Sequence, residues 1–203
     1  MKHYGIKLVS NGFSWQDIPV LEMECYYKNP PDSIKAYAQI CCGEDSLNVH
    51  LWTTEPSRRE EEKDLLGSPC RDSCLEFFFS PMENDKRYFN VEFNANGCLF
   101  LGIGSCLEDL TRLVSSDFVA ERIIIPQIDK KDGGWDLFYS IPFEFIRRFF
   151  PDFKPCEGKS MKANCYKCSD RGEYPHYLSW SPIEGLPFSY HRAECFGTMT
   201  FVK

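Results

Sequence analysis

The chain has 203 residues, a net charge of −7, 43% hydrophobic residues and 15% aromatic residues. This length is typical of one domain, and the aromatic content argues against intrinsic disorder. The negative charge and the absence of a basic stripe argue against nucleic acid as a partner, and no apolar run is long enough for a membrane span. We therefore expect one domain over residues 1–203, with residues 1–14 as an N-terminal segment.

Eleven cysteines are an odd number, which fits poorly with a closed disulfide framework. Cys41 and Cys42 are adjacent, and most of the others stand in apolar or strand-like runs, where a free cysteine acts as a small buried hydrophobe. The sequence predicts reduced, mostly buried thiols and a cytoplasmic protein. Residues 1–14 hold no apolar run of secretory-signal length, although a signal removed beforehand stays an alternative. The oligomeric state is left open.

Period-two hydrophobic runs separated by turn clusters predict short strands. The predicted strands are residues 34–42, 46–54, 73–80, 88–94, 98–103, 121–125, 135–141, 162–168, 177–180 and 195–202. Asn96-Gly97 is a typical hairpin turn, while 55–64 and 129–134 are expected to be charged loops. Residues 142–150 predict a short helix that begins at a proline. Many short strands with one or two short helices indicate an all-β, mostly antiparallel β-sandwich of jelly-roll-like type.

Two central strands divide their side chains between two faces. One face carries apolar residues, namely Leu75, Phe77, Phe79, Phe89, Val91 and Phe93. The opposite face carries Glu76, Asn90, Glu92 and Asn94. Carboxylates and amides suit sugar hydroxyls, which both donate and accept hydrogen bonds. Trp180, or else Trp52, is the candidate aromatic wall for the apolar face of a sugar. The alternative is an ordinary solvated sheet face.

Several motifs resemble carbohydrate-binding module family 9, a DOMON-like β-sandwich family often attached to xylanases. The matching segments are Asp72–Phe78, Tyr88–Asn94, Tyr177–Pro182 and His191–Gly197, preceded by Trp15, Ile18-Pro19 and Leu47–Glu55. The resemblance runs from about Trp15 to the end of the chain.

The resemblance implies binding of sugars or oligosaccharides, typically at chain ends between two tryptophans, and a link to xylan or other polysaccharide catabolism. Trp180 matches one wall and Glu76 matches a hydrogen-bonding carboxylate, while Asn90 and Glu92 occupy strand positions where the family places polar contacts. Cys70 stands where the family has its second tryptophan wall. Some family members carry structural calcium, but no spacing here fixes a calcium site, and no other cofactor is expected.

Three alternatives remain open from the residues. Glu76 and Glu92 would suit the acid and nucleophile of a glycoside hydrolase. The chain would otherwise be a structural module whose sugar site has degenerated. Cys165 and Cys168, followed by His176, have the gap of a zinc-binding pair, but no second pair has that gap, and Cys70 and Cys74 are far away in sequence.

Overall fold

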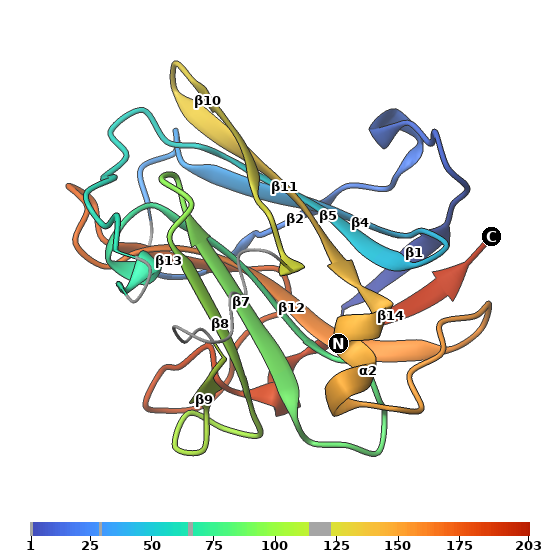
Figure 1. Ribbon diagram of the computed structural model, residues 1–203. Helices are drawn as coiled ribbons and strands as arrows, with labels where there is room; N and C mark the ends of the chain where they lie inside the picture. The colour runs from blue at the N-terminus through green and yellow to red at the C-terminus, as the bar shows by residue number, and fades with distance from the viewer. Residues whose placement is uncertain (1, 29, 65–66, 114–122) are drawn as a thin grey trace.

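The computed structural model describes residues 2–28, 30–64, 67–113 and 123–203. They form a curled, mixed β-sheet folded into a sandwich (Figure 1). The strands are β1 His3–Leu8, β2 Leu21–Glu22, β3 Cys25–Lys28, β4 Lys35–Cys42, β5 Ser46–Thr54, β6 Cys74–Ser80, β7 Tyr88–Asn94, β8 Leu99–Gly104, β9 Thr111–Arg112, β10 Gln127–Lys131, β11 Gly134–Pro142, β12 Ser160–Ser169, β13 His176–Ser179 and β14 Gly197–Val202. The helices are α2 Phe143–Phe149 and the 3-10 turns η1 Trp15–Asp17, η2 Pro69–Arg71 and η3 Ala193–Cys195.

The strand order is β10-β11-β5-β4-β1-β14-β12-β6-β7-β8-β9. Strands β10, β11, β5 and β4 make the first layer, and β12, β6, β7 and β8 make the second layer (Figure 1). Strand β1 joins the two layers, because it pairs in parallel with both β14 and β4. The sheet is therefore mixed, and residues 3–8 of the expected N-terminal segment are a strand at the centre of the order.

The core between the layers confirms the predicted face of the central hairpin. Phe77, Phe79, Phe89 and Phe93 all belong to one buried hydrophobic cluster, together with residues of β4, β5 and β11. Strands β5 and β7 have the predicted bounds, and the predicted helix is α2. Pro142 stands at the N-cap of α2, while Phe143, Phe145 and Ile146 are buried.

The strand predicted at 121–125 is wrong where the structure describes it. Residues 123–125 lie outside any strand, and 121–122 lie outside the described residues. The strand is instead β10, whose second half overlaps the stretch 129–134 expected to be a charged loop, and it pairs with β11 across a tight turn. Gly133 has a φ of +84° in this turn, a conformation that favours glycine. Because β10 is a mostly exposed edge strand, it lacks the hydrophobic alternation that marks the others.

The outer face of the second layer is covered by residues 181–196, which we call the covering loop. Its Tyr190 is buried and stacks on Tyr166 of β12 at a ring-centroid distance of 4.0 Å. The Tyr190 hydroxyl donates to the carbonyl oxygens of Lys167 and Leu178. A second hydrophobic cluster thus forms behind the hairpin, containing Cys74, Phe78, Tyr88, Tyr166, Cys168, Tyr190 and Phe196.

All eleven cysteines fall within the described residues, and all of them are free thiols there. Six are buried: Cys41, Cys42, Cys74, Cys98, Cys165 and Cys168. This agrees with the prediction of reduced, mostly buried thiols. No helix in the described part of the chain is long and apolar enough to cross a membrane.

Candidate functional site

The polar face of the central hairpin is closed to solvent. Glu76 lies directly opposite Glu92 across β6 and β7, and the two residues are 2% and 7% exposed. Asn90 and Asn94 are fully buried. The expectation of an exposed face is therefore wrong, because the covering loop and the aromatic residues of the second cluster pack over it.

The polar groups of this face bond to one another. Asn90 Nδ2 donates to Glu92 Oε1 at 2.9 Å, and the Cys168 thiol donates to Glu76 Oε1 at 3.1 Å. Burial raises the pKa of both glutamates, and their mutual repulsion raises that of Glu76 further. Asn94 instead binds the loop that precedes β6, because its Nδ2 donates to Asp72 Oδ2 at 2.9 Å. A polysaccharide cannot reach two carboxyls this deeply buried, so the arrangement does not suit a glycoside hydrolase.

Trp180 lies on the other side of the sheet from Glu76. It is 4% exposed, belongs to the core between the layers, and meets Tyr4 edge-on at 6.4 Å between ring centroids. A Cβ at position 197 would overlap the Trp180 ring, so Gly197 is needed for this packing. Trp180 and Glu76 are thus not brought together, and the expected exposed tryptophan wall is wrong. Cys70, in η2, is half-buried against the second cluster.

Trp52 is half-exposed on the outer face of the first layer. It belongs to a row of stacked rings, which we call the aromatic ladder. Tyr37, Trp52, His50 and Phe138 follow one another at centroid distances of 5.2, 4.5 and 4.0 Å. The rings stand face to face because Tyr37 pairs with Trp52, and His50 with Phe138, across neighbouring strands. Neighbouring rings of the aromatic ladder therefore cover most of each other's faces.

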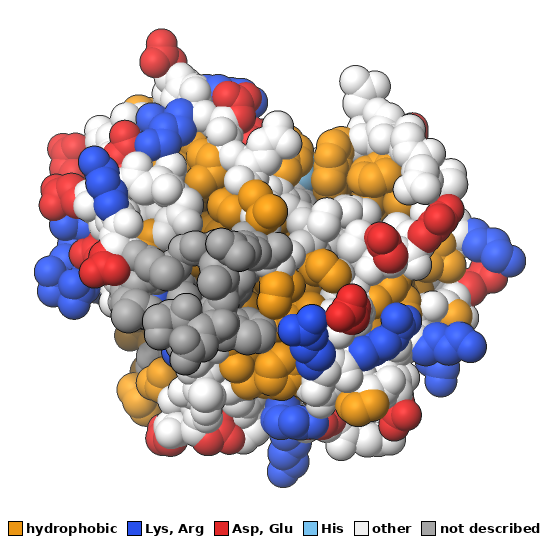
Figure 2. Space-filling view, viewed as in Figure 1, with side chains coloured by type: hydrophobic (Ala, Val, Ile, Leu, Met, Phe, Trp, Pro, Cys, Tyr) orange, Lys and Arg blue, Asp and Glu red, His pale blue; other side chains and the backbone are white. Residues whose placement is uncertain are grey.

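A groove of about 670 Å³ lies at the Phe138 end of the ladder. Trp15 of η1 forms one wall and lies 6.0 Å from Phe138 between ring centroids. Gln39 holds this wall, since its Nε2 donates to the carbonyl oxygens of Trp15 and Ile18, each at 2.8 Å. Figure 2 shows hydrophobic side chains gathered over the middle of this side of the molecule. The groove is lined by Phe13, Trp15, Asn48, Ile123, Ile125, Gln127, Phe138, Tyr139, Ser140 and Pro142.

Sequence reasoning identified Trp52 but missed the groove. Trp15 was noted only as part of the resemblance. The signal that could have found it is the run Phe13-Ser14-Trp15, which places two aromatic residues in an otherwise polar stretch before the first predicted strand. Ser14 caps η1 by accepting a hydrogen bond from the Gln16 amide, which fixes the turn carrying Trp15.

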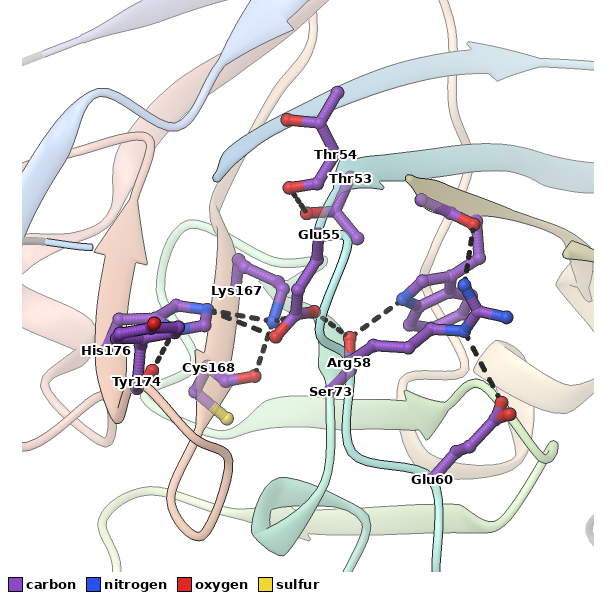
Figure 3. Close-up of polar contacts among 12 residues, drawn as sticks. Thr53, Thr54, Glu55, Arg58, Glu60, Ser73, Lys167, Cys168, Tyr174 and His176 are labelled. Atoms are coloured by element: carbon purple, nitrogen blue, oxygen red, sulfur yellow. Dashed lines mark hydrogen bonds and ion pairs between the residues drawn. The ribbon is translucent and has the colours of Figure 1, made fainter. Parts of the chain in front are cut away.

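A buried polar network, which we call the lock, is formed by Glu55, Ser73, Lys167 and His176 (Figure 3). Lys167 Nζ lies 3.0 Å from Glu55 Oε2 and donates to the Cys168 carbonyl at 2.8 Å. Glu55 also accepts from Ser73 Oγ. His176 accepts from Lys167 through Nε2 at 3.0 Å and donates from Nδ1 to the Tyr174 carbonyl at 2.6 Å.

Both ring nitrogens of His176 are occupied, so this histidine is no ligand for a Cys165–Cys168 pair. Burial, with Lys167 nearby, lowers the pKa of His176 to about 4. Cys165 lies in the core between the layers, whereas Cys168 lies in the second cluster. Residues three apart on a strand face opposite sides. The zinc site considered at Cys165, Cys168 and His176 is therefore wrong.

The fold and the partly exposed aromatic groove place this protein in the class of β-sandwich binding modules. The chain belongs to carbohydrate-binding family 9, whose model matches residues 4–201. It is thus a carbohydrate-binding protein, and the match begins earlier than Trp15 because β1 belongs to the fold.

Solved structures agree with this family. A candidate carbohydrate-binding protein from Bacteroides uniformis has a TM-score of 0.78 at 26% identity over 99% of each chain. A family 9 module from Caldicellulosiruptor kristjanssonii in complex with cellotriose has a TM-score of 0.70 at 10% identity, over 98% of this chain and 93% of the module. Its complex with glucose gives 0.69 at 11% identity, over 99% and 96%. These two similarities show the fold. No curated protein matches this chain.

Proposed function

We propose that this protein binds gluco-configured sugars, as free glucose or at the ends of β-linked glucan chains, in the groove beside Trp15 and Phe138. The similar modules in complex with cellotriose and glucose support the sugar class. The observation that carries the location is the groove itself, where half-exposed aromatic rings stand beside neutral hydrogen-bonding side chains.

The chemistry of the groove suits a neutral sugar. The Trp15 and Phe138 rings offer apolar surface to the C–H face of a pyranose. Asn48, Gln127 and Ser140 supply amide and hydroxyl groups for its hydroxyls, and none of the described residues that line the groove is charged. Binding sites commonly combine apolar walls with a few such polar groups.

Accessibility favours this groove over the hairpin face. A sugar cannot stack on Trp180 or reach Glu76 and Asn90 without displacing the core or the covering loop, because all three are at least 96% buried. Glu92, at 7% exposure, is the more exposed of the two carboxyl groups that face each other there. The hairpin face therefore stands as the alternative location in the test.

The test is calorimetric titration of the protein with glucose and cellotriose. We expect dissociation constants of about 0.1–1 mM, because one aromatic wall with a few hydrogen bonds gives roughly 4–5.5 kcal/mol. Trp15→Ala should weaken binding at least about tenfold, the loss of 1.4 kcal/mol or more, with unchanged circular dichroism. Tyr26→Ala is the matched control, since Tyr26 is an exposed aromatic residue outside this groove.

The results of these binding experiments distinguish the groove from the hairpin face, and a sugar-binding module from a structural module or an enzyme. If Trp15→Ala binds as tightly as the wild type while Glu92→Gln weakens binding, the sugar site is the hairpin face. If no sugar binds in a glycan-array screen, with or without calcium, the module is a structural one with a degenerate site. Release of a reducing sugar from an oligosaccharide would instead favour an enzyme.

We also propose that residues 1–203 act as one domain in a reducing compartment such as the cytoplasm. Eleven free thiols support the compartment, and the family match over residues 4–201 supports the single domain. Limited proteolysis should leave one resistant core, whereas two stable fragments would contradict the domain assignment.

A further inference from the structure

Two cysteines that are far apart in sequence face each other beneath the covering loop. Cys74 of β6 and Cys168 of β12 are direct partners across neighbouring antiparallel strands. Glu76 follows two residues after Cys74 and so faces the same side of the sheet. The thiol sulfurs and a carboxylate oxygen of these three residues lie within 4.8 Å of one another. In the part of the chain that the structure describes, no other three histidine, cysteine or acidic residues gather in this way.

The spacing of these atoms suits a tetrahedral metal ion. Zinc binds sulfur at about 2.3 Å and carboxylate oxygen at about 2.0–2.2 Å, so its ligands lie roughly 3.3–3.8 Å apart. The Cys168 sulfur already lies 3.1 Å from Glu76 Oε1. Side-chain adjustments of less than an ångström would therefore place the three donors around one ion.

Burial and charge also call for a cation. Cys74 and Glu76 are at most 2% exposed, as is Cys168, and Glu92 lies across the strand pair from Glu76. Two positively charged side chains outside the cluster attract these carboxyl groups electrostatically: Lys167 attracts Glu76, and Arg112 attracts Glu92. Lys167 is already paired with Glu55 on the other face of β12. A buried carboxylate that keeps its charge is paired or bound to a metal.

Cys70 of η2 is the candidate for a fourth donor. It packs against the second hydrophobic cluster, which contains Cys74 and Cys168, and the Cys70 carbonyl oxygen lies 3.7 Å from the Cys168 sulfur. Asn90 Oδ1 is buried on the same face without a hydrogen-bond partner, while its Nδ2 holds Glu92. An unpartnered buried oxygen of this kind is rare and suits a polar species beside the carboxylates.

We propose that Cys74, Cys168 and Glu76, with the Cys70 thiol as fourth donor, form a structural zinc site that ties β6 to β12 and to η2. Zinc displaces the thiol protons, which pass to solvent, and the thiolates bind the ion. The lock fixes the backbone on the opposite face, because Ser73 precedes Cys74 and Lys167 precedes Cys168 (Figure 3).

The donor set discriminates between metals. Thiolates are soft ligands that select zinc, whereas calcium takes six to eight oxygen ligands. This site therefore differs from the structural calcium that the family resemblance leaves open. It also places a metal ligand at Cys70, the position where the resemblance implies a tryptophan wall.

The experiment measures metal in the full chain, purified under reducing conditions and without a chelator. Elemental analysis should give about one zinc per chain. After chelation, cobalt titration should produce the thiolate-to-cobalt charge-transfer band, and zinc should raise the melting temperature. Cys74→Ala and Cys168→Ala should each lower zinc content to less than about a tenth, and Glu76→Gln should weaken zinc binding at least about tenfold. Cys165→Ala is the matched control, because Cys165 faces the core.

The cobalt spectrum keeps the test decisive even if a variant fails to fold, since its intensity in the wild type reports the number of bound thiolates. Absence of both zinc and the cobalt band in the wild type would overturn the site. Equal loss of zinc in Cys165→Ala would assign the metal to other residues. A Cys74–Cys168 disulfide, found by mass spectrometry of protein purified under reducing conditions, would replace the metal site with a covalent cross-link.

Discussion

Lys167 and Glu55 form an ion pair of 3.0 Å with side-chain exposures of 0% and 3%. The pair joins β12 of the second layer to the residue that follows β5 of the first layer. Ser73 extends it, donating to Glu55 and accepting from Trp135 Nε1 of β11 at 2.8 Å. Each described polar group of this network has a partner, so the network holds the two layers in register.

Removing only one charged partner of the lock should lower the free energy of unfolding strongly. Lys167→Met leaves the Glu55 carboxylate buried and unpaired, which should lower the free energy of unfolding by about 3–5 kcal/mol. Glu55→Gln should cost a similar amount, and the double variant less than the sum, as urea unfolding will show. Glu144→Gln breaks the exposed pair with Arg148 and should change stability by less than about 0.5 kcal/mol. Equal losses in Lys167→Met and this control would mean that the lock is not stabilising.

Trp180 should matter for stability. Truncating a buried tryptophan or phenylalanine to alanine typically costs about 3–5 kcal/mol. Trp180→Ala and Phe77→Ala, both in the core between the layers, should each lower the free energy of unfolding by that amount. Leu107→Ala is the control, because Leu107 is exposed. A Trp180→Ala variant as stable as the wild type would indicate that this ring is free to meet a ligand.

The sequence predicted the hairpins because their hydrophobic residues alternate with period two. Phe77, Phe79, Phe89 and Phe93 follow that rule, so their shared core was predictable. The alternation could not show what lies over the opposite face. Residues 181–196 contain two prolines, one glycine and several polar residues, a composition typical of an exposed loop, yet Tyr190 and Phe196 bury the hairpin's polar side.

The candidate site depended on contacts between distant segments, which local patterns do not specify. Trp180 lies at the end of a strand, where the alternation of side chains does not determine which face of the sheet its ring occupies. The ring lies in the core because Gly197, which has no side chain, leaves room for it there. Cys74 and Cys168 are 94 positions apart and meet because β6 pairs with β12 in one register. The sequence gap between Cys165 and Cys168 therefore suggested the wrong partners for Cys168.

The thiol count tests the cysteine assignment. Denaturing the unreduced protein with a chelator present should expose eleven reactive thiols, because all eleven cysteines are free in the structure. Burial raises the pKa of Cys41 to about 11 and that of Cys98 to about 11, so these thiols should react slowly in the folded protein. Exposed Cys156 should react first. A denatured count of three or fewer would mean that most of the cysteines form disulfides.

Acid should destabilise the fold through its buried histidines. Burial lowers the pKa of His176 and of His191 to about 4, against about 6.5 in an unfolded chain. Between these values the folded state binds fewer protons than the unfolded state, so stability is fully present above pH 6.5 and falls as the pH falls toward 4. Each histidine should account for a loss of about 2 kcal/mol between pH 7 and pH 5.

Urea unfolding at several pH values between 7 and 5, with a chelator so that metal loss does not contribute, measures this slope. His191→Gln should flatten it by the share of one histidine, because an amide can still pair with the Tyr88 hydroxyl, which lies 2.9 Å from His191 Nδ1. A His191→Gln profile parallel to that of the wild type would show that His191 titrates alike in the folded and unfolded chains, and the pH dependence would then belong to other groups.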